Sequence, residues 1–283
     1  MAPGKDIRLD RKCLEALHIF GVPYTRLDFS QPVIKETLER KLIYVPADFT
    51  DGKYDFYVDS ARLASSLEVR IVGKSLGLEL ENTCIDTLKR EFIVGFDQDE
   101  SIKIANLLGA SVMPVELANY FLRLLYQGSK SKVGVYDENK NRLDSKFCER
   151  IFEDIISLNP IWRGEWLEED FVMKEGELYG QRKKTLDSNK NIFVGDCYKL
   201  DEDVLREDKT PGISLIDWIN NPTEHGFPKK DILKEQVFFW HPRVVGGVGL
   251  DAGSFSRVEF DCSSIRSYRD SYRGVRLVFL AKQ

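Results

Sequence analysis

The stretch Phe238-Phe239-Trp240-His241-Pro242-Arg243 begins a C-terminal segment that ends on Gly274-Val275-Arg276-Leu277-Val278-Phe279-Leu280. Between these ends, apolar residues alternate with Arg, Ser and Glu in the pattern of half-buried strands, at Phe255, Val258 and Phe260. The last seven residues predict a strand in which Arg276 is the one inward-facing or edge charge. Residues 262–273 are rich in Ser, Arg, Tyr and Asp, which are typical of binding loops. The segment therefore predicts a hairpin at Val275–Leu280 that closes the fold beneath a polar loop.

Composition describes an ordinary globular protein with enough apolar residues for one large or two modest domains. The 283 residues are 42% hydrophobic and 31% charged, and the formal net charge is -5. A general affinity for nucleic acid requires a basic face that releases counterions, so the negative balance disfavours it.

Several classes of site and location are also disfavoured by the sequence. We expect no association with a membrane, because no apolar run approaches the roughly 20 residues needed to cross one. Residues 1–8 lack the apolar core of a signal peptide, so we expect a cytoplasmic protein. The five cysteines and three histidines are scattered, which favours reduced thiols and predicts neither a metal site nor a cofactor: Cys13, Cys84, Cys148, Cys197, Cys262, His18, His225 and His241. Four aspartates lack the spacing of a calcium loop and are predicted to form turns and solvated strand faces: Asp48, Asp51, Asp55 and Asp59.

Periodicity predicts a mixed α+β fold. Helical spacing, caps and stop residues predict helices at Asp10–Phe20, after Ser30, from Asp97 to Gly109, from Pro114, and at Asp144–Leu158. Short strands are predicted at Leu42–Val45, Tyr54–Val58, Leu67–Val72, Leu76–Leu80 and Phe92–Phe96. A hairpin across Glu175-Gly176 joins the predicted strands Asp170–Lys174 and Glu177–Gln181. Trp162 and Trp166 precede it and are interpreted as core residues in preference to a sugar-binding platform.

The polar segment from Gln181 to Lys234 is predicted to be a long irregular insertion with one helical turn at Leu215–Ile219. The chain is predicted to divide into an α+β module at residues 1–97 and a second domain at residues 98–283.

Two separated segments carry a family resemblance. The first is Ala105-Asn106-Leu107-Leu108-Gly109-Ala110-Ser111-Val112-Met113-Pro114-Val115-Glu116, and the second is Arg266-Ser267-Tyr268-Arg269-Asp270-Ser271-Tyr272-Arg273-Gly274-Val275-Arg276-Leu277-Val278. Together with Trp166 and the Phe239-Trp240 pair, they make residues 101–283 resemble the C-type-lectin-like fold in its formylglycine-generating-enzyme-like form. Bacterial and phage variable ligand-binding proteins diversified by retroelements share that form. The resemblance implies a lectin-like domain with a display surface.

The sequence departs from the family pattern at several positions, and these departures limit which properties of the family can be expected of this chain. Val115 stands where the family has Thr, and Asn119 beside Tyr120 stands where it has a nearby Trp. Formylglycine-generating enzymes bind copper with two nearby cysteines, whereas Cys262 is alone in this region. The resemblance therefore implies the fold without the copper chemistry.

The leading hypothesis is a non-enzymatic intracellular binding or adaptor protein, associated with a phage, a mobile element or defence, that presents its C-terminal face to a protein partner. Tyr and Arg are favoured as interface anchors, and the candidate partner-binding residues are Arg257, Glu259, Arg266, Tyr268, Arg269, Asp270, Tyr272 and Arg273. An ordinary solvated loop is an equally good interpretation of this region. Two other functions stay open. One is an enzyme with a site centred on Cys262 and His241. The other is a binder of single-stranded nucleic acid that uses the C-terminal Arg and Tyr residues.

Overall fold

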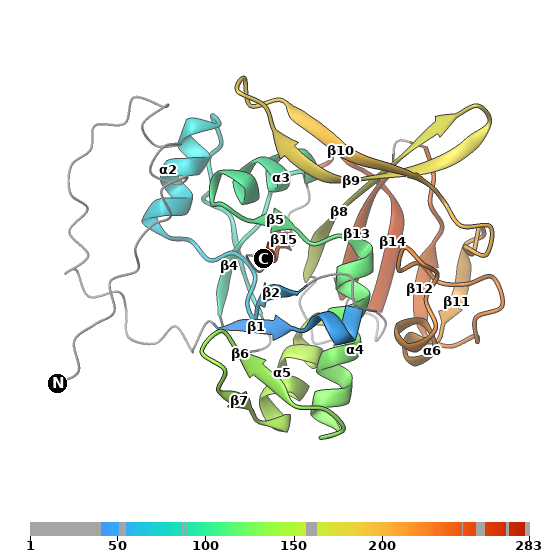
Figure 1. The fold of residues 1–283 in the computed structure, drawn as a ribbon. Helices are drawn as coiled ribbons and strands as arrows, with labels where there is room; N and C mark the ends of the chain where they lie inside the picture. Colours follow the sequence, from blue (N-terminus) through green and yellow to red (C-terminus); the bar gives the residue numbers. More distant parts are fainter. Residues whose placement is uncertain are drawn as a thin grey trace.

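The computed structural model describes residues 41–50, 55–86, 88, 90–156, 163–244, 246–252, 258–269 and 272–280. The helices predicted at Asp10–Phe20 and after Ser30 lie outside the described residues. The described chain is a mixed α+β fold, as predicted (Figure 1).

A six-stranded sheet joins the first described strands to the last strand of the chain. Its order is β5-β16-β2-β1-β6-β7, with β1 at Leu42–Val45, β2 at Phe56–Asp59, β5 at Ser111–Val112, β6 at Val135–Asp137, β7 at Arg142–Leu143 and β16 at Leu277–Leu280. β16 runs antiparallel to both of its neighbours, with Val278 opposite Val58 on one side and Ser111 on the other. This sheet therefore combines strands from both sides of the predicted division between residues 97 and 98.

The larger sheet has eight strands. Its order is β10-β9-β8-β13-β14-β12-β11, and β15 pairs with β8 outside that path. The bounds are β8 Arg163–Lys174, β9 Glu177–Leu186, β10 Ile192–Lys199, β11 Lys209–Ile213, β12 Val237–Trp240, β13 Gly246–Ala252, β14 Val258–Ile265 and β15 Arg273–Val275. In Figure 1, β9 and β10 form a long ribbon across the top of the molecule. A separate two-stranded sheet pairs β3 (Thr83–Ile85) with β4 (Glu91–Ile93).

The hairpin predicted at Val275–Leu280 is wrong. β15 runs parallel to β8, with Val275 opposite Trp166, whereas β16 belongs to the smaller sheet. The chain changes sheet at Arg276, whose buried guanidinium donates to the Asp59 carbonyl oxygen at 2.9 Å and pairs with Glu165. Arg276 is thus inward-facing, and its ionic partners hold the crossing point in place.

The prediction of irregular structure at Gln181–Lys234 is also wrong over much of its length. β9 continues to Leu186, and β10 pairs with it in an antiparallel ladder from Ile192 to Lys199, in which Gly195 has no register partner. Alternating long side chains support this ladder, since Arg182 and its cross-strand partner Asp196 form an ion pair of 2.9 Å. The predicted helical turn is confirmed as α6, at Leu215–Asn220.

Three helices that position the candidate site are confirmed with their predicted starts. These are α3 at Gln98–Leu107, α4 at Val115–Ser129 and α5 at Ser145–Ile156. Asp97 and Glu100 form a reciprocal capping box at the start of α3, and Asp144 accepts a hydrogen bond from the Phe147 N–H at the start of α5. Local sequence alone is enough to fix these starts because both cap partners lie within three residues of each other.

The strands predicted at Leu67–Val72 and Leu76–Leu80 are wrong. Residues Leu67–Ser75 form helix α2, because the Ser66 side chain accepts from the Val69 N–H and caps the first turn. Residues 76–80 fold back on that helix, and Leu80 packs where a Cβ on Gly73 would lie only 2.5 Å from its Cδ1 atom. A short apolar run cannot distinguish a buried helix face from a strand.

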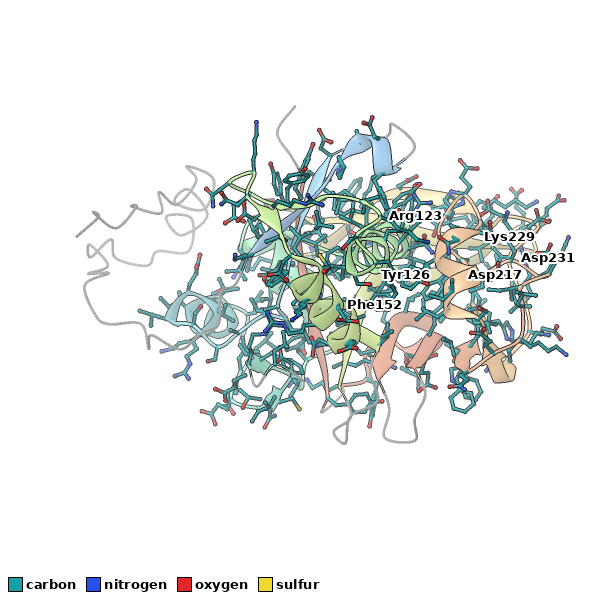
Figure 2. The ribbon with its side chains drawn as sticks, turned by 90° about the horizontal axis from the view of Figure 1, so that it is seen from below. Arg123, Tyr126, Phe152, Asp217, Lys229 and Asp231 are labelled. Carbon is teal, nitrogen blue, oxygen red and sulfur yellow. The ribbon has the colours of Figure 1, made fainter. Side chains whose placement is uncertain are left out.

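α4 packs against β1 and β6 of the smaller sheet and β8 of the larger one, and α5 packs against α4 and β13; Figure 2 shows both helices from below. Tyr126 on α4 faces Phe152 on α5, with ring centroids 5.6 Å apart, and Arg123 donates to the Phe49 carbonyl oxygen at 2.7 Å. Phe49 lies in the short 3-10 helix η1 (Ala47–Thr50) that follows β1. On the larger sheet, Trp166 is buried and donates its indole N–H to the Phe96 carbonyl oxygen, which confirms the prediction that it is a core residue.

Candidate functional site

The turn at the end of β14 carries two exposed apolar side chains. Ile265 is 66% exposed and Tyr268 is 62% exposed. The Tyr268 N–H donates to the Ile265 carbonyl oxygen at 2.9 Å, so the two residues occupy the first and last positions of one turn. Both side chains are therefore presented on the same short loop.

This turn is fixed to the start of α3 by backbone and side-chain contacts. The Gln98 N–H donates to the Arg266 carbonyl oxygen at 3.0 Å. The buried Gln98 side chain in turn donates to the carbonyl oxygens of Leu167 and Glu169, at 2.6 Å each. The turn is thereby tied to both α3 and β8.

Two arginines in the turn add ion pairs. Arg266 contacts Asp170 of β8 and lies 3.5 Å from Asp99, and Arg269 contacts Glu100. Asp99 and Glu100 lie in the first turn of α3, where acidic side chains also interact favourably with the helix dipole. Both arginine side chains remain about half exposed, so they surround the apolar residues without being covered.

A second turn adds one more apolar residue to this surface. Val244 is 42% exposed and follows Arg243, whose carbonyl oxygen accepts from the Gly246 N–H. Gly246 is the register partner of Ile265. We call the exposed set the turn patch, made of Val244, Ile265, Arg266, Tyr268 and Arg269.

Other predicted partner-binding residues lie beneath this patch. Arg273 is only 3% exposed, stacks over the Trp166 ring at 4.6 Å, and pairs with Asp261 at 3.1 Å. Its guanidinium also fills the space beside Gly249, where a Cβ would lie 2.8 Å from it. Tyr272 lies beside this guanidinium, 6.0 Å from ring centroid to Cζ. Arg273 and Tyr272 therefore support the patch from within the fold.

The Glu259 side chain contacts Trp240 and is not part of the turn patch. Its carboxylate accepts the Trp240 indole N–H, and burial raises its pKa more than that hydrogen bond lowers it. Arg257 and Asp270 lie outside the described residues. The structure thus groups Arg266, Tyr268 and Arg269 from the predicted set. It adds Val244 and Ile265. Ile265 is a single apolar residue among the polar residues 263–267, whereas Val244 lies in an apolar and glycine-rich stretch that gives no sign of exposure.

The Cys262 thiol and the His241 ring face different surroundings. Cys262 is fully buried in the core, and burial, with the nearby charges of Asp261 and Glu169, raises its pKa well above the usual value. The His241 ring Nδ1 lies 2.7 Å from the Asp208 carboxylate, which also accepts from the His241 backbone N–H. Among the described residues no hydrogen bond joins His241 to Cys262, so a nucleophile and base pair is not formed here.

The C-terminal arginines are largely neutralised within the fold. Arg266, Arg269, Arg273 and Arg276 all pair with carboxylates. Phosphate contacts by these groups would compete with ion pairs that already exist, which disfavours a role for them in binding nucleic acid.

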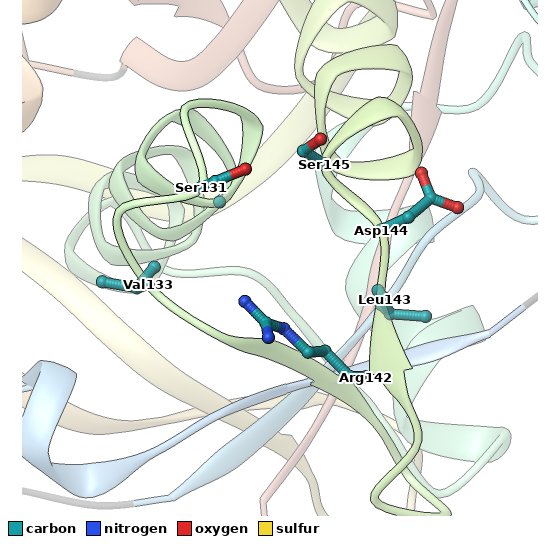
Figure 3. Close-up of a pocket in the computed structure, with 7 residues that line it drawn as sticks. Ser131, Val133, Arg142, Leu143, Asp144 and Ser145 are labelled. Carbon is teal, nitrogen blue, oxygen red and sulfur yellow. The ribbon is translucent and has the colours of Figure 1, made fainter.

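A separate cavity of about 290 Å³ lies between the end of α4, the β6–β7 hairpin and the start of α5 (Figure 3). It is lined by Gly128, Ser131, Val133, Arg142, Leu143, Asp144 and Ser145.

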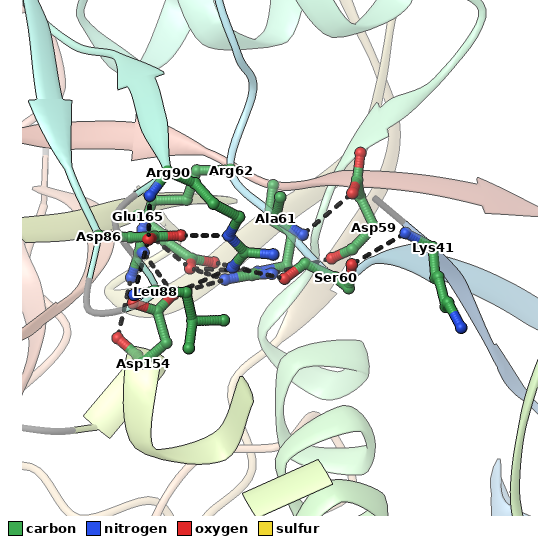
Figure 4. Close-up of polar contacts among 11 residues, drawn as sticks. Lys41, Asp59, Ser60, Ala61, Arg62, Asp86, Leu88, Arg90, Asp154 and Glu165 are labelled. Atoms are coloured by element: carbon green, nitrogen blue, oxygen red, sulfur yellow. Dashed lines mark hydrogen bonds and ion pairs between the residues drawn. The ribbon is translucent and has the colours of Figure 1, made fainter. Parts of the chain in front are cut away.

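A buried ionic cluster connects the two sheets (Figure 4). Arg62 and Arg276 both contact Glu165, at 3.1 Å and 2.6 Å, and Arg62 also pairs with Asp154 of α5 at 2.8 Å. Burial alone would raise the pKa of Glu165, but the charges of Arg276 and Arg62 outweigh it and lower the pKa. Because its charges are matched and enclosed, this cluster holds the fold together and offers no reactive group to a substrate.

One buried acid is not matched in this way. Glu169 on β8 is fully buried, and burial together with the charge of Glu168 raises its pKa to about 8. The Val115 N–H at the start of α4 donates to one of its oxygens at 2.7 Å. The sequence offered only a run of three acidic residues, Glu168-Glu169-Asp170, which ends on the first residue of the predicted strand and gives no sign of burial.

The described residues contain no group of three or more His, Cys, Asp or Glu side chains placed to hold a metal ion. Two of the aspartates that were considered for calcium accept hydrogen bonds within the fold. Asp55 accepts from the Ala47 N–H and the Tyr44 hydroxyl, and Asp59 accepts from the Ala61 N–H. Within those residues, too, none of the helices has the length and apolar character needed to cross a membrane.

No protein-family model, curated protein or solved structure matches this chain.

Proposed function

We propose that this chain is a non-enzymatic binding protein that presents the turn patch to a protein partner. The observation that carries the proposal is the exposure of Ile265 and Tyr268 on a turn whose backbone is held by Gln98. Apolar and aromatic side chains on a fixed loop lose little conformational entropy on binding, which favours their use as interface anchors.

The charges around the patch support the same proposal. Arg266 and Arg269 are oriented by carboxylates of β8 and α3, yet remain half exposed. An apolar centre surrounded by oriented arginines is the arrangement that protein interfaces favour. The matching partner surface would offer an apolar pocket for Tyr268 with hydrogen-bond acceptors at its rim.

We also propose that residues 98–283 adopt the C-type-lectin-like fold. This is supported by the pairing of β5 with β16, since β5 lies in the first segment of the resemblance and β16 begins in the second. Closing a domain by pairing its first and last strands is a feature of that fold. The group that this chain resembles includes variable ligand-binding proteins of bacteria and phages, so a phage-, mobile-element- or defence-associated role is part of the proposal.

The test compares three forms of the full chain. In the first variant, Ile265→Ser and Tyr268→Ser are combined, and in the control, Phe193→Ser removes a 63% exposed aromatic residue from β10. Proteins captured by the wild-type chain from its native host are identified, purified and titrated against each form by calorimetry. We expect the double variant to weaken binding by about a hundredfold and the control to bind as the wild type does.

Thermal unfolding first establishes that all three forms are folded. A folded double variant that binds the purified partner with wild-type affinity would contradict the proposal. A control that weakens binding as much as the double variant would assign the interface to the β9–β10 ribbon.

A further inference from the structure

The cavity beside α5 is lined by groups that donate hydrogen bonds. Figure 3 shows the Arg142 guanidinium directed into the space below Ser131, while the Asp144 carboxylate points away from it. Ser131 and Ser145 also line the cavity, together with the apolar side chains of Val133 and Leu143. The lining therefore combines one cation, two serines and two apolar residues.

The start of α5 adds backbone donors. α5 has twelve residues, and the N–H groups of its first turn have no carbonyl partner within the helix. Asp144 accepts the Phe147 N–H at 2.7 Å, and Ser145, the first residue of α5, lines the cavity. The helix dipole makes this end favourable for a negative charge.

Local charge distinguishes this region from the acidic chain as a whole. Residues 128–146 contain five basic side chains, Lys130, Lys132, Lys140, Arg142 and Lys146, and three acidic ones, Asp137, Glu138 and Asp144. Each of the three carboxylates accepts at least one backbone N–H group, as Asp137 does from Asn139 and Asn141. Within the described ranges, none of the five basic side chains forms an ion pair with a carboxylate.

We propose that this cavity binds the phosphate group of a small ligand, at a site separate from the turn patch. Arg142 presents a planar fork that matches two phosphate oxygens, and two serines, one of them at the start of α5, line the same space. Donors on several sides suit a tetrahedral oxyanion better than a flat carboxylate. A volume of about 290 Å³ is at the lower end for ligand pockets, so the ligand is smaller than a nucleotide.

The test uses the full chain, with phenyl phosphate, inorganic phosphate and benzoate as probes. Binding is followed through the amide NMR signals of Ser145 and Lys146 and by calorimetry. The variants are Arg142→Gln and, as a control, Arg150→Gln, which removes an exposed arginine from α5. Near-UV circular dichroism checks that each variant keeps its fold, and Arg142→Lys replaces Arg142→Gln if the latter does not.

We expect saturable phosphate binding with shifts at both amides, and weaker binding of benzoate. Arg142→Gln should reduce the affinity by at least about tenfold, and Arg142→Lys by less, because it keeps the charge and loses the fork. Tighter binding of phenyl phosphate would identify a phosphate ester that uses Val133 and Leu143, and tighter binding of inorganic phosphate would identify the free ion.

Three results would overturn the proposal. The first is the absence of saturable phosphate binding to the folded wild-type chain. The second is a folded Arg142→Gln or Arg142→Lys variant that binds phosphate with wild-type affinity. The third is a loss of affinity in the Arg150→Gln control as large as that in the Arg142 variant, which would indicate nonspecific attraction to positive charge.

Discussion

The buried side chains of Arg276 and Glu165, which are 111 positions apart in the sequence, form a bidentate ion pair. The Arg276 Nη2 atom lies 2.6 Å from Oε1 of Glu165, and the Arg276 Nε atom lies 3.0 Å from Oε2. Both side chains are at most 1% exposed. The pair joins the crossing point between the two sheets to β8, where Glu165 also receives Arg62.

Replacing Arg276 by Met should destabilise the fold strongly, because it leaves the buried Glu165 carboxylate with less compensating charge. We expect a loss of about 3 to 5 kcal/mol in the free energy of unfolding, measured by urea denaturation. The control is Lys199→Met, which removes the exposed pair with Glu177 and should cost less than about 1 kcal/mol. Similar losses for the two variants would show that the buried pair contributes no more than a surface pair.

Glu169 should make stability depend on pH in a defined window. Its pKa is about 8 in the folded chain, against an ordinary value of 4.5, chiefly because of burial. Between these values the folded state binds a proton that the unfolded state has released, so stability falls as pH rises from 4.5 to 8. Glu169→Gln cannot titrate and keeps an acceptor for the Val115 N–H, so this part of the pH dependence should disappear.

The gain of the Glu169→Gln variant over the wild type should therefore grow towards pH 8, to the order of a few kcal/mol. Urea denaturation at a series of pH values measures it, with the exposed Glu149→Gln variant as control. Parallel curves for Glu169→Gln and the wild type would contradict the assignment.

Gly226 should not tolerate a side chain. Its φ angle is +87°, and a Cβ there would lie 2.6 Å from the Glu116 Cα atom in the first turn of α4. Gly226→Ala should therefore cost about 2 to 4 kcal/mol through backbone strain and the shift it forces on α4. Gly176 has a similar φ angle of +80° and nothing within 4 Å of a Cβ, so Gly176→Ala should cost only about 1 kcal/mol. Thermal unfolding of the two variants separates the steric effect from the backbone effect.

The thiols should differ widely in their rates of alkylation. Cys84 and Cys197 are partly exposed and should react first, in a chain from which Cys13 has been removed by Cys13→Ser. Burial, with the charge of Asp144, raises the pKa of Cys148 to about 11, and burial acts on Cys262 in the same direction. Iodoacetamide labelling followed by peptide mass spectrometry should therefore modify these two only after denaturant is added. Rapid labelling of Cys262 in the native chain would favour the enzyme hypothesis instead.

Features that depend on neighbours in the sequence were predicted from the sequence. The starts of α3 and α5 follow from Asp97 with Glu100 and from Asp144 with Phe147. The hairpin across Glu175-Gly176 was also predicted, and both residues have positive φ angles. In each case the hydrogen bonds or the conformation involve residues only a few positions apart, so the local sequence carries the information.

Other features were not predicted from the sequence. The strand predicted at residues 67–72 is wrong for a local reason: a short apolar run does not distinguish a buried helix face from a strand, and the Ser66 cap starts a helix. The surface residues depend on distant partners. Ile265 became a candidate only when its exposure was known, whereas Arg273, which the sequence had put forward together with Tyr268, is stacked on Trp166.

The sequence by itself determined the α+β class, the starts of the main helices, and the inward or edge position of Arg276. Tertiary structure decided that the last strand lies between β2 and β5, and that the arginines of the C-terminal segment are divided between the interior and the surface. The physical reason is that Arg276 is held by Glu165 and by the Asp59 carbonyl oxygen, 111 and 217 positions away. Such contacts form only when the sheets assemble, and no local pattern of residues encodes them.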